Sequence, residues 1–121
     1  MKSHKDLDVW RIAVDLAQDI YGISKGFPAD ERFGMTAQMR RASVSIASNI
    51  AEGAARNTPR EFAQYLYIAL GSASELETQL EIARRVNLIN EVDWARIDAS
   101  LARVAQMLRG LIRSVKSDLE T

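Results

Sequence analysis

The chain has 121 residues, a length that suits one domain with a single hydrophobic core. Its 16 basic residues balance 16 acidic residues, and the absence of cysteine excludes disulfides and thiolate metal sites and fits a reducing cytosol. No apolar run approaches the roughly 20 residues of a membrane span, and the N-terminal MKSHKDLDVW lacks the pattern of a signal peptide. We therefore expect a cytoplasmic protein that does not contact a membrane.

The first half of the sequence predicts two helices, at about 8–25 and 30–56. Apolar residues recur at helical spacing in both, and Lys25-Gly26-Phe27-Pro28 ends the first helix. The second is expected to begin at Asp30-Glu31, whose charges suit the positive end of a helix dipole. The two apolar stripes comprise Val9, Ile12/Ala13, Leu16, Ile20 and Ile23, then Met35, Met39, Ala42, Ile46 and Ile50.

The second half predicts two further helices, at about 59–86 and 91–117. Thr58-Pro59-Arg60-Glu61 has the form of a capping box with proline at the first helical position, and Asn90 is the expected N-cap of the last helix. The two apolar stripes comprise Phe62, Leu66, Ala69, Ala73, Leu76, Leu80 and Ala83, then Trp94, Ile97, Leu101, Val104, Leu108, Leu111 and Val115.

The stripes meet in order when consecutive helices fold back on one another. Ala83 then faces Trp94, and the pairing continues down to Phe62 with Val115. The first two helices pair in the same way, so each hairpin is antiparallel with a short connection. The predicted fold is all-α: residues 1–121 form one domain, an up-down-up-down antiparallel four-helix bundle.

The stretch RRASVSIASNIAEGAAR, residues 40–56, places small and polar side chains where a core helix would carry leucines. A hairpin between the second and third helices sets Ser45 opposite Gly71, which would allow close backbone approach. It also sets Arg41 opposite Glu75, where the two could form a charge-assisted pair. These residues are therefore candidates for polar contacts between helices.

Two further residues of this stretch, Asn49 and Glu52, belong to the same candidate set. Glu52 and Arg56 are four residues apart in the order that favours a surface ion pair. Asn49 is either an exposed or locally hydrogen-bonded residue, or a buried contact between helices or subunits that specifies register.

The sequence resembles a family of small four-helix-bundle proteins encoded by intervening sequences of bacterial 23S rRNA genes. SNIAEG at 48–53 and GSASELETQL at 71–80 carry the resemblance most specifically, and it covers nearly the whole chain. Relatives include the accessory variability determinant of diversity-generating retroelements, which acts on nucleic acid with a reverse transcriptase. The resemblance implies a homopentamer, a barrel of bundles around a central opening.

Several apolar residues remain after the core stripes are assigned, and such a surplus usually marks a contact site. The alternative is a wider core face than a strict two-position seam. The surplus residues are Trp10, Val44, Tyr65, Tyr67, Ile68, Leu70, Met107 and Ile112.

Catalytic and metal-binding patterns are missing from the sequence. His4 is the only histidine, and no Glu-x-x-His pair of the kind that binds metals in helical bundles is present. Glu77 and Glu81 fit a solvated strip that pairs with Arg84 or Arg85. We expect no catalytic residue, no metal and no cofactor.

The sequence leaves two functions open. The first is a non-catalytic cytosolic homo-oligomer that acts as a scaffold or interaction module for an unknown protein partner. The alternative is an RNA- or DNA-binding accessory factor associated with ribosomal RNA or a reverse transcriptase, which the zero net charge disfavours. Cations near the end of the last helix also suit its dipole. The candidate nucleic-acid patch comprises Arg40, Arg56, Arg60, Arg109, Arg113 and Lys116.

Overall fold

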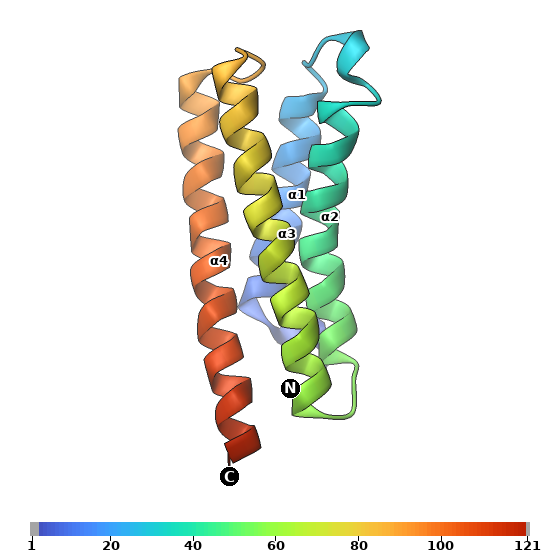
Figure 1. Ribbon diagram of the computed structural model, residues 1–121, viewed down its shortest axis with the longest axis vertical. Helices are drawn as coiled ribbons and strands as arrows, with labels where there is room; N and C mark the ends of the chain where they lie inside the picture. Colours follow the sequence, from blue (N-terminus) through green and yellow to red (C-terminus); the bar gives the residue numbers. More distant parts are fainter. Residues whose placement is uncertain (1–2, 121) are drawn as a thin grey trace.

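The computed structural model describes residues 3–120, which form an all-helical antiparallel four-helix bundle (Figure 1). The long helices are α1 (Asp8–Ser24), α2 (Met35–Ala54), α3 (Pro59–Arg85) and α4 (Glu91–Glu120). A 3-10 helix, η1 (His4–Asp6), precedes α1, and a second, η2 (Ala29–Glu31), lies between α1 and α2. Each long helix packs against the next one in sequence, and α1 packs against α4 to close the bundle. This topology is the predicted one.

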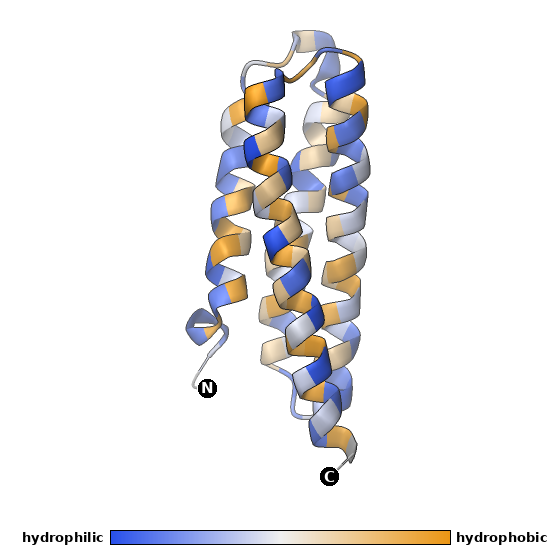
Figure 2. Cartoon of the chain, turned by 90° about the vertical axis from the view of Figure 1, so that its left-hand side faces the viewer, coloured by the Kyte–Doolittle hydropathy of each residue, from blue (hydrophilic) through white to orange (hydrophobic). Residues whose placement is uncertain are grey.

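The core is built from the predicted apolar stripes. As each helix turns, hydrophobic residues alternate with hydrophilic ones, so that one face of every helix points inward (Figure 2). The large side chains with almost no exposed surface all belong to those stripes. They are Leu16, Ile20, Met39, Ile46, Ile50, Leu66, Leu76, Leu80, Ile97, Leu101, Val104 and Leu108.

The start of the second helix differs from the prediction. Ala29–Glu31 form only the short helix η2, and α2 begins at Met35. Gly34, at the N-cap position, has φ −103° and ψ −114°, so its backbone is not helical and α2 begins after it. Gly34 supplies no side-chain cap, so the first backbone N–H groups of α2 lack the usual side-chain acceptor. The other three helices begin at the predicted residues, and the C-terminal ends of all four helices differ from prediction by one to three residues.

Side-chain caps fix the starts of α3 and α4 as predicted. The Thr58 hydroxyl accepts a hydrogen bond from the Glu61 amide at 3.2 Å, which is one half of the predicted capping box. The Asn90 side chain accepts from the Asp93 amide at 2.8 Å. Both bonds satisfy N–H groups that a helix leaves unpaired at its first turn.

The α3–α4 connection is a Schellman turn centred on Asn87, which has φ 64°. The Leu88 amide donates to the Ala83 carbonyl at 2.8 Å, and the Asn87 amide donates to the Arg84 carbonyl at 3.1 Å. Asparagine is one of the few residues that adopts this left-handed conformation readily. The turn reverses the chain so that the stripes of α3 and α4 meet.

Candidate functional site

The most extensive helix contact in the bundle joins α2 and α3, and Ser45 of α2 lies in it. The Ser45 and Ser72 hydroxyls lie 2.9 Å apart and share a hydrogen bond. Ser45 therefore faces Ser72, and the predicted facing of Ser45 with Gly71 is wrong by one residue. Gly71 is exposed, and a Cβ added to it would meet no atom within 4 Å.

Asn49 makes a local hydrogen bond, which was one of the two alternatives for this residue. Its side-chain amide donates to the Ser45 carbonyl at 2.8 Å and to the Ser45 hydroxyl at 3.0 Å. The side chain is half-buried. Asn49 thus positions the serine that bridges α2 and α3.

The close approach between α2 and α3 occurs at Gly53. A Cβ added there would lie 2.7 Å from the Tyr65 Cβ and 3.0 Å from the Phe62 Cδ1. Gly53 is buried and lies at the C-terminal end of α2, next to the connection between α2 and α3. Sequence reasoning missed this role, although the glycine that closes the SNIAEG motif was a signal for it.

The predicted ion pair between Arg41 and Glu75 is absent from the part of the chain that the structure describes. Both residues line the same open groove beside α2. The Glu75 carboxylate instead accepts a 3.4 Å hydrogen bond from the Gln79 side chain. Because Arg41 and Glu75 are exposed, solvation competes with pairing.

Arg56 does not pair with Glu52 within residues 3–120. Its guanidinium donates to the Tyr65 hydroxyl at 2.5 Å and lies 4.8 Å from the centre of the Tyr65 ring. Arg56 follows the end of α2, where the chain has left the helical path that would align it with Glu52. The arginine therefore ties the hairpin connection to α3.

The six residues of the predicted basic patch do not form one surface. Arg40 lies over the Tyr21 ring of α1 and donates to the Ser24 hydroxyl at 2.8 Å. Fourteen residues separate Arg40 from Ala54 at the end of α2, which is roughly 20 Å at about 1.5 Å per residue. The remaining five are exposed residues of α3, α4 and the α2–α3 connection. They are Arg56, Arg60, Arg109, Arg113 and Lys116.

Lys116 bridges α4 and α3. Its ammonium group donates to the Tyr67 hydroxyl at 3.2 Å and lies 5.7 Å from the centre of that ring. Tyr65 and Tyr67 therefore each contact one cation, Arg56 and Lys116, near the first turns of α3.

The acidic strip of α3 is a solvated ion-pair network, as predicted. Glu81 contacts Arg85 at 2.8 Å and Arg84 at 3.5 Å, and Arg84 reaches Glu91 of α4 at 3.0 Å. The hydrogen bond from Arg85 lowers the pKa of Glu81, and the hydrogen bond to Glu91 raises the pKa of Arg84. The lowered carboxylate pKa means that this pairing contributes above the ordinary pKa of glutamate and is lost on acidification. The exposure of these groups keeps the contribution small.

The surplus apolar residues divide between core and surface. Ile112 is buried, and Trp10, Leu70 and Met107 pack against the core, so the wider core face accounts for these residues. Val44, Tyr67 and Ile68 remain exposed, and Ile82 joins them. Tyr67 contacts Lys116 of α4, and Ile82 lines a groove with Trp94 of α4. We call the four exposed residues of α2 and α3 the outer α2–α3 surface.

The described side chains also bear on metal binding and on membrane insertion. Across residues 3–120, no group of three or more metal-ligating side chains is placed to hold an ion. None of the helices in this range combines the length and apolar character required to span a bilayer.

These observations define an antiparallel helical bundle with a tightly packed α2–α3 hairpin and four exposed apolar side chains on α2 and α3. Residues 5–110 match the family model described as 23S rRNA-intervening sequence protein. The chain belongs to this family, as the resemblance predicted.

One solved structure has a fold similar to that of this chain. The chain is similar to a protein with unknown function from the S23 ribosomal protein family of Bacteroides thetaiotaomicron, at 28% sequence identity and a TM-score of 0.79. The similarity covers 86% of this chain and 97% of that chain. A comparison with curated proteins found no match.

Proposed function

We propose that this protein is a non-catalytic interaction module that works as a homo-oligomer, with subunits meeting through the outer α2–α3 surface. The observation that carries the proposal is the exposure of four large apolar side chains, Val44 of α2 and Tyr67, Ile68 and Ile82 of α3. Exposed apolar surface of this kind usually marks a protein contact. A pentameric ring, the form that the resemblance implies, is the assembly that we propose.

The outward side of α3 between these apolar side chains is mixed in character. The exposed residues between Ile68 and Ile82 include Ser74, Thr78 and Glu75, and Glu75 is seven residues from each isoleucine. Burial of the apolar side chains would supply contact area, and the Glu75 carboxylate would need a polar partner from the neighbouring subunit. A ring of such bundles would offer a scaffold for a protein partner through its remaining surfaces.

A charge placed in this surface is expected to disrupt assembly. We expect Ile68→Glu to reduce the mass measured by size-exclusion chromatography with light scattering to that of a smaller species, because the carboxylate would be buried without a partner. The helical content measured by circular dichroism should stay unchanged, since Ile68 is 51% exposed within one subunit.

The matched control is Val92→Glu, at a residue that is 78% exposed and lies at the start of α4. This variant should keep the mass of the unmodified protein. A monomeric unmodified protein, or an Ile68→Glu variant of unchanged mass, would contradict the proposed interface.

Nucleic-acid binding is the second candidate function, and one observation favours it. Arg56 and Lys116 each lie over a tyrosine ring near the same end of the bundle, and cations beside aromatic rings are a common surface for single-stranded nucleic acid. We expect binding to mixed-sequence RNA, if this candidate holds, to weaken steeply between low and physiological salt in fluorescence anisotropy. Lys116→Ala should weaken it, whereas Arg85→Ala, at an exposed arginine elsewhere, should not. No binding at low salt would remove this candidate.

A further inference from the structure

We propose that two oppositely charged grooves on each subunit are complementary, so that the groove along α2 of one copy of this chain packs against the groove between α3 and α4 of the next copy. This inference rests on the proposed homo-oligomer and names the two surfaces that its subunits join. We call them the α2 groove, which Val44 lines, and the α3–α4 groove, which Ile82 lines.

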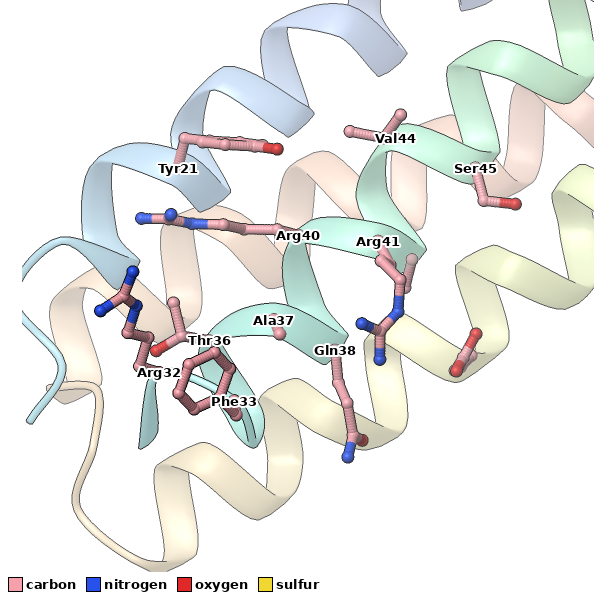
Figure 3. Close-up of a pocket in the computed structure, with 12 residues that line it drawn as sticks. Tyr21, Arg32, Phe33, Thr36, Ala37, Gln38, Arg40, Arg41, Val44 and Ser45 are labelled. Carbon is pink, nitrogen blue, oxygen red and sulfur yellow. The ribbon is translucent and has the colours of Figure 1, made fainter. Parts of the chain in front are cut away.

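The α2 groove combines exposed apolar side chains with an excess of positive charge. Tyr21 and Val44 are each 42% exposed, and Phe33 is 86% exposed. Figure 3 shows the Arg40 side chain extending toward Tyr21 and that of Arg41 on the other side of α2. Three arginines and one glutamate leave the lining with a formal charge of +2; they are Arg32, Arg40, Arg41 and Glu75.

The α3–α4 groove has the opposite charge. The exposed side chain of Ile82 and the half-buried ring of Trp94 supply its apolar area. Three carboxylates and one arginine leave its lining with a formal charge of −2; they are Glu77, Glu81, Asp98 and Arg85. Each groove therefore offers apolar contact area together with the charge that the other groove lacks.

Several charges in the two grooves have no partner within the subunit. Among residues 3–120, no ion pair forms at Arg32 or Arg41 in the α2 groove, or at Glu77 or Asp98 in the α3–α4 groove. Contact between two subunits would pair these charges without breaking an existing ion pair. Charges of opposite sign also raise the rate at which two surfaces meet.

The two grooves lie at the same end of the bundle. The α2 groove follows the first turns of α2, and the α3–α4 groove is built by the last turns of α3 and the first turns of α4. These segments lie together at the top of Figure 1. Subunits that stand side by side with parallel helices therefore bring the α2 groove of one level with the α3–α4 groove of the next.

The charges favour contact between unlike grooves over contact between like grooves. A two-fold dimer built on either groove alone would set two surfaces of the same net charge against each other. Contact between unlike grooves leaves one groove of each kind free at the ends of a row of subunits, so addition continues until a ring closes. The minority charges of the two linings, Glu75 and Arg85, are also opposite in sign.

The test is reversal of charge in each groove, with association measured by sedimentation velocity over a dilution series of the full chain. We expect Arg32→Glu with Arg41→Glu, and separately Glu77→Lys with Asp98→Lys, to raise the concentration of half-dissociation at least about tenfold. A variant with all four substitutions should return to within about threefold of the unmodified protein, because the two grooves are again opposite in charge.

The matched controls are Arg103→Glu and Asp15→Arg, at exposed residues that line neither groove. Both should associate like the unmodified protein. Circular dichroism checks that every variant keeps its helical content. Glu77→Lys alone, at an exposed residue, replaces its pair if Asp98→Lys, at a half-buried residue, affects folding.

The outcomes separate this inference from the proposed function. Unchanged association of either reversed groove, while Ile68→Glu still dissociates the protein, would overturn the pairing of grooves and leave the homo-oligomer standing. A four-substitution variant that associates as weakly as the variants of one groove would also overturn the pairing. A monomeric unmodified protein would overturn the pairing together with the proposed function.

Discussion

Replacing Leu76 with alanine is expected to lower the free energy of unfolding by about 2–5 kcal/mol. Leu76 lies midway along α3 with no exposed surface, and its side chain belongs to the core that all four helices share. Alanine would remove apolar contacts and leave a cavity that the surrounding helices can fill only in part. Chemical denaturation followed by circular dichroism, at one fixed protein concentration, measures the change.

The control for this prediction is Val92→Ala. Val92 is 78% exposed, so its truncation should change the free energy of unfolding by less than about 0.5 kcal/mol. A loss below about 1 kcal/mol for Leu76→Ala would mean that the α3 stripe does not face the core.

Gly53→Ala is expected to destabilise the protein by about 1–3 kcal/mol, as overpacking does. Alanine favours helix over glycine by about 1 kcal/mol, so intrinsic propensity alone predicts the opposite sign. The added methyl group would lie 2.7 Å from the Tyr65 Cβ and 3.2 Å from the Phe62 carbonyl oxygen. Neither atom can rotate away, so α2 and α3 would have to separate.

Gly71→Ala is the matched control, because Gly71 is also a helical glycine. Its added methyl group would meet no atom within 4 Å, so alanine should stabilise the protein by about 0.5–1 kcal/mol. Opposite signs for the two variants in thermal or chemical denaturation would separate close packing from helix propensity. Stabilisation by both would mean that the α2–α3 contact is looser than the structure shows.

Apolar spacing was sufficient to predict the four long helices and the core between them. Leu76, Leu80 and their partners on α4 repeat every three or four residues, and burial of one face follows directly from that repeat. The break before α2 was not predicted, because acidic residues such as Asp30 favour the first turn of a 3-10 helix and of an α-helix alike. The backbone angles of Gly34, which cannot be read from spacing, decide where α2 begins.

The contacts between helices were harder to predict than the helices. Each residue along a helix turns the side-chain direction by about 100°. An error of one position in the register therefore predicted Gly71 opposite Ser45, where the structure has Ser72. The role of Gly53 depends on the distance between two helix axes, which is a property of the packed hairpin. Arg56 was assigned to Glu52 by local spacing, but a tyrosine of the next helix lies within its reach.

The order of the helices has a consequence for how the chain opens and closes. Contacts between consecutive helices connect nearby parts of the sequence. Among the long helices described, only the contact between α1 and α4 joins the two ends of the chain. A topology dominated by local contacts favours rapid folding, and joining the ends carries the largest loop-closure entropy. The α1–α4 and α1–α2 contacts are also the two least extensive between long helices. We therefore expect α1 to detach at a lower free energy than the α2–α3 hairpin separates, and its amides should exchange with solvent hydrogen before those of the hairpin.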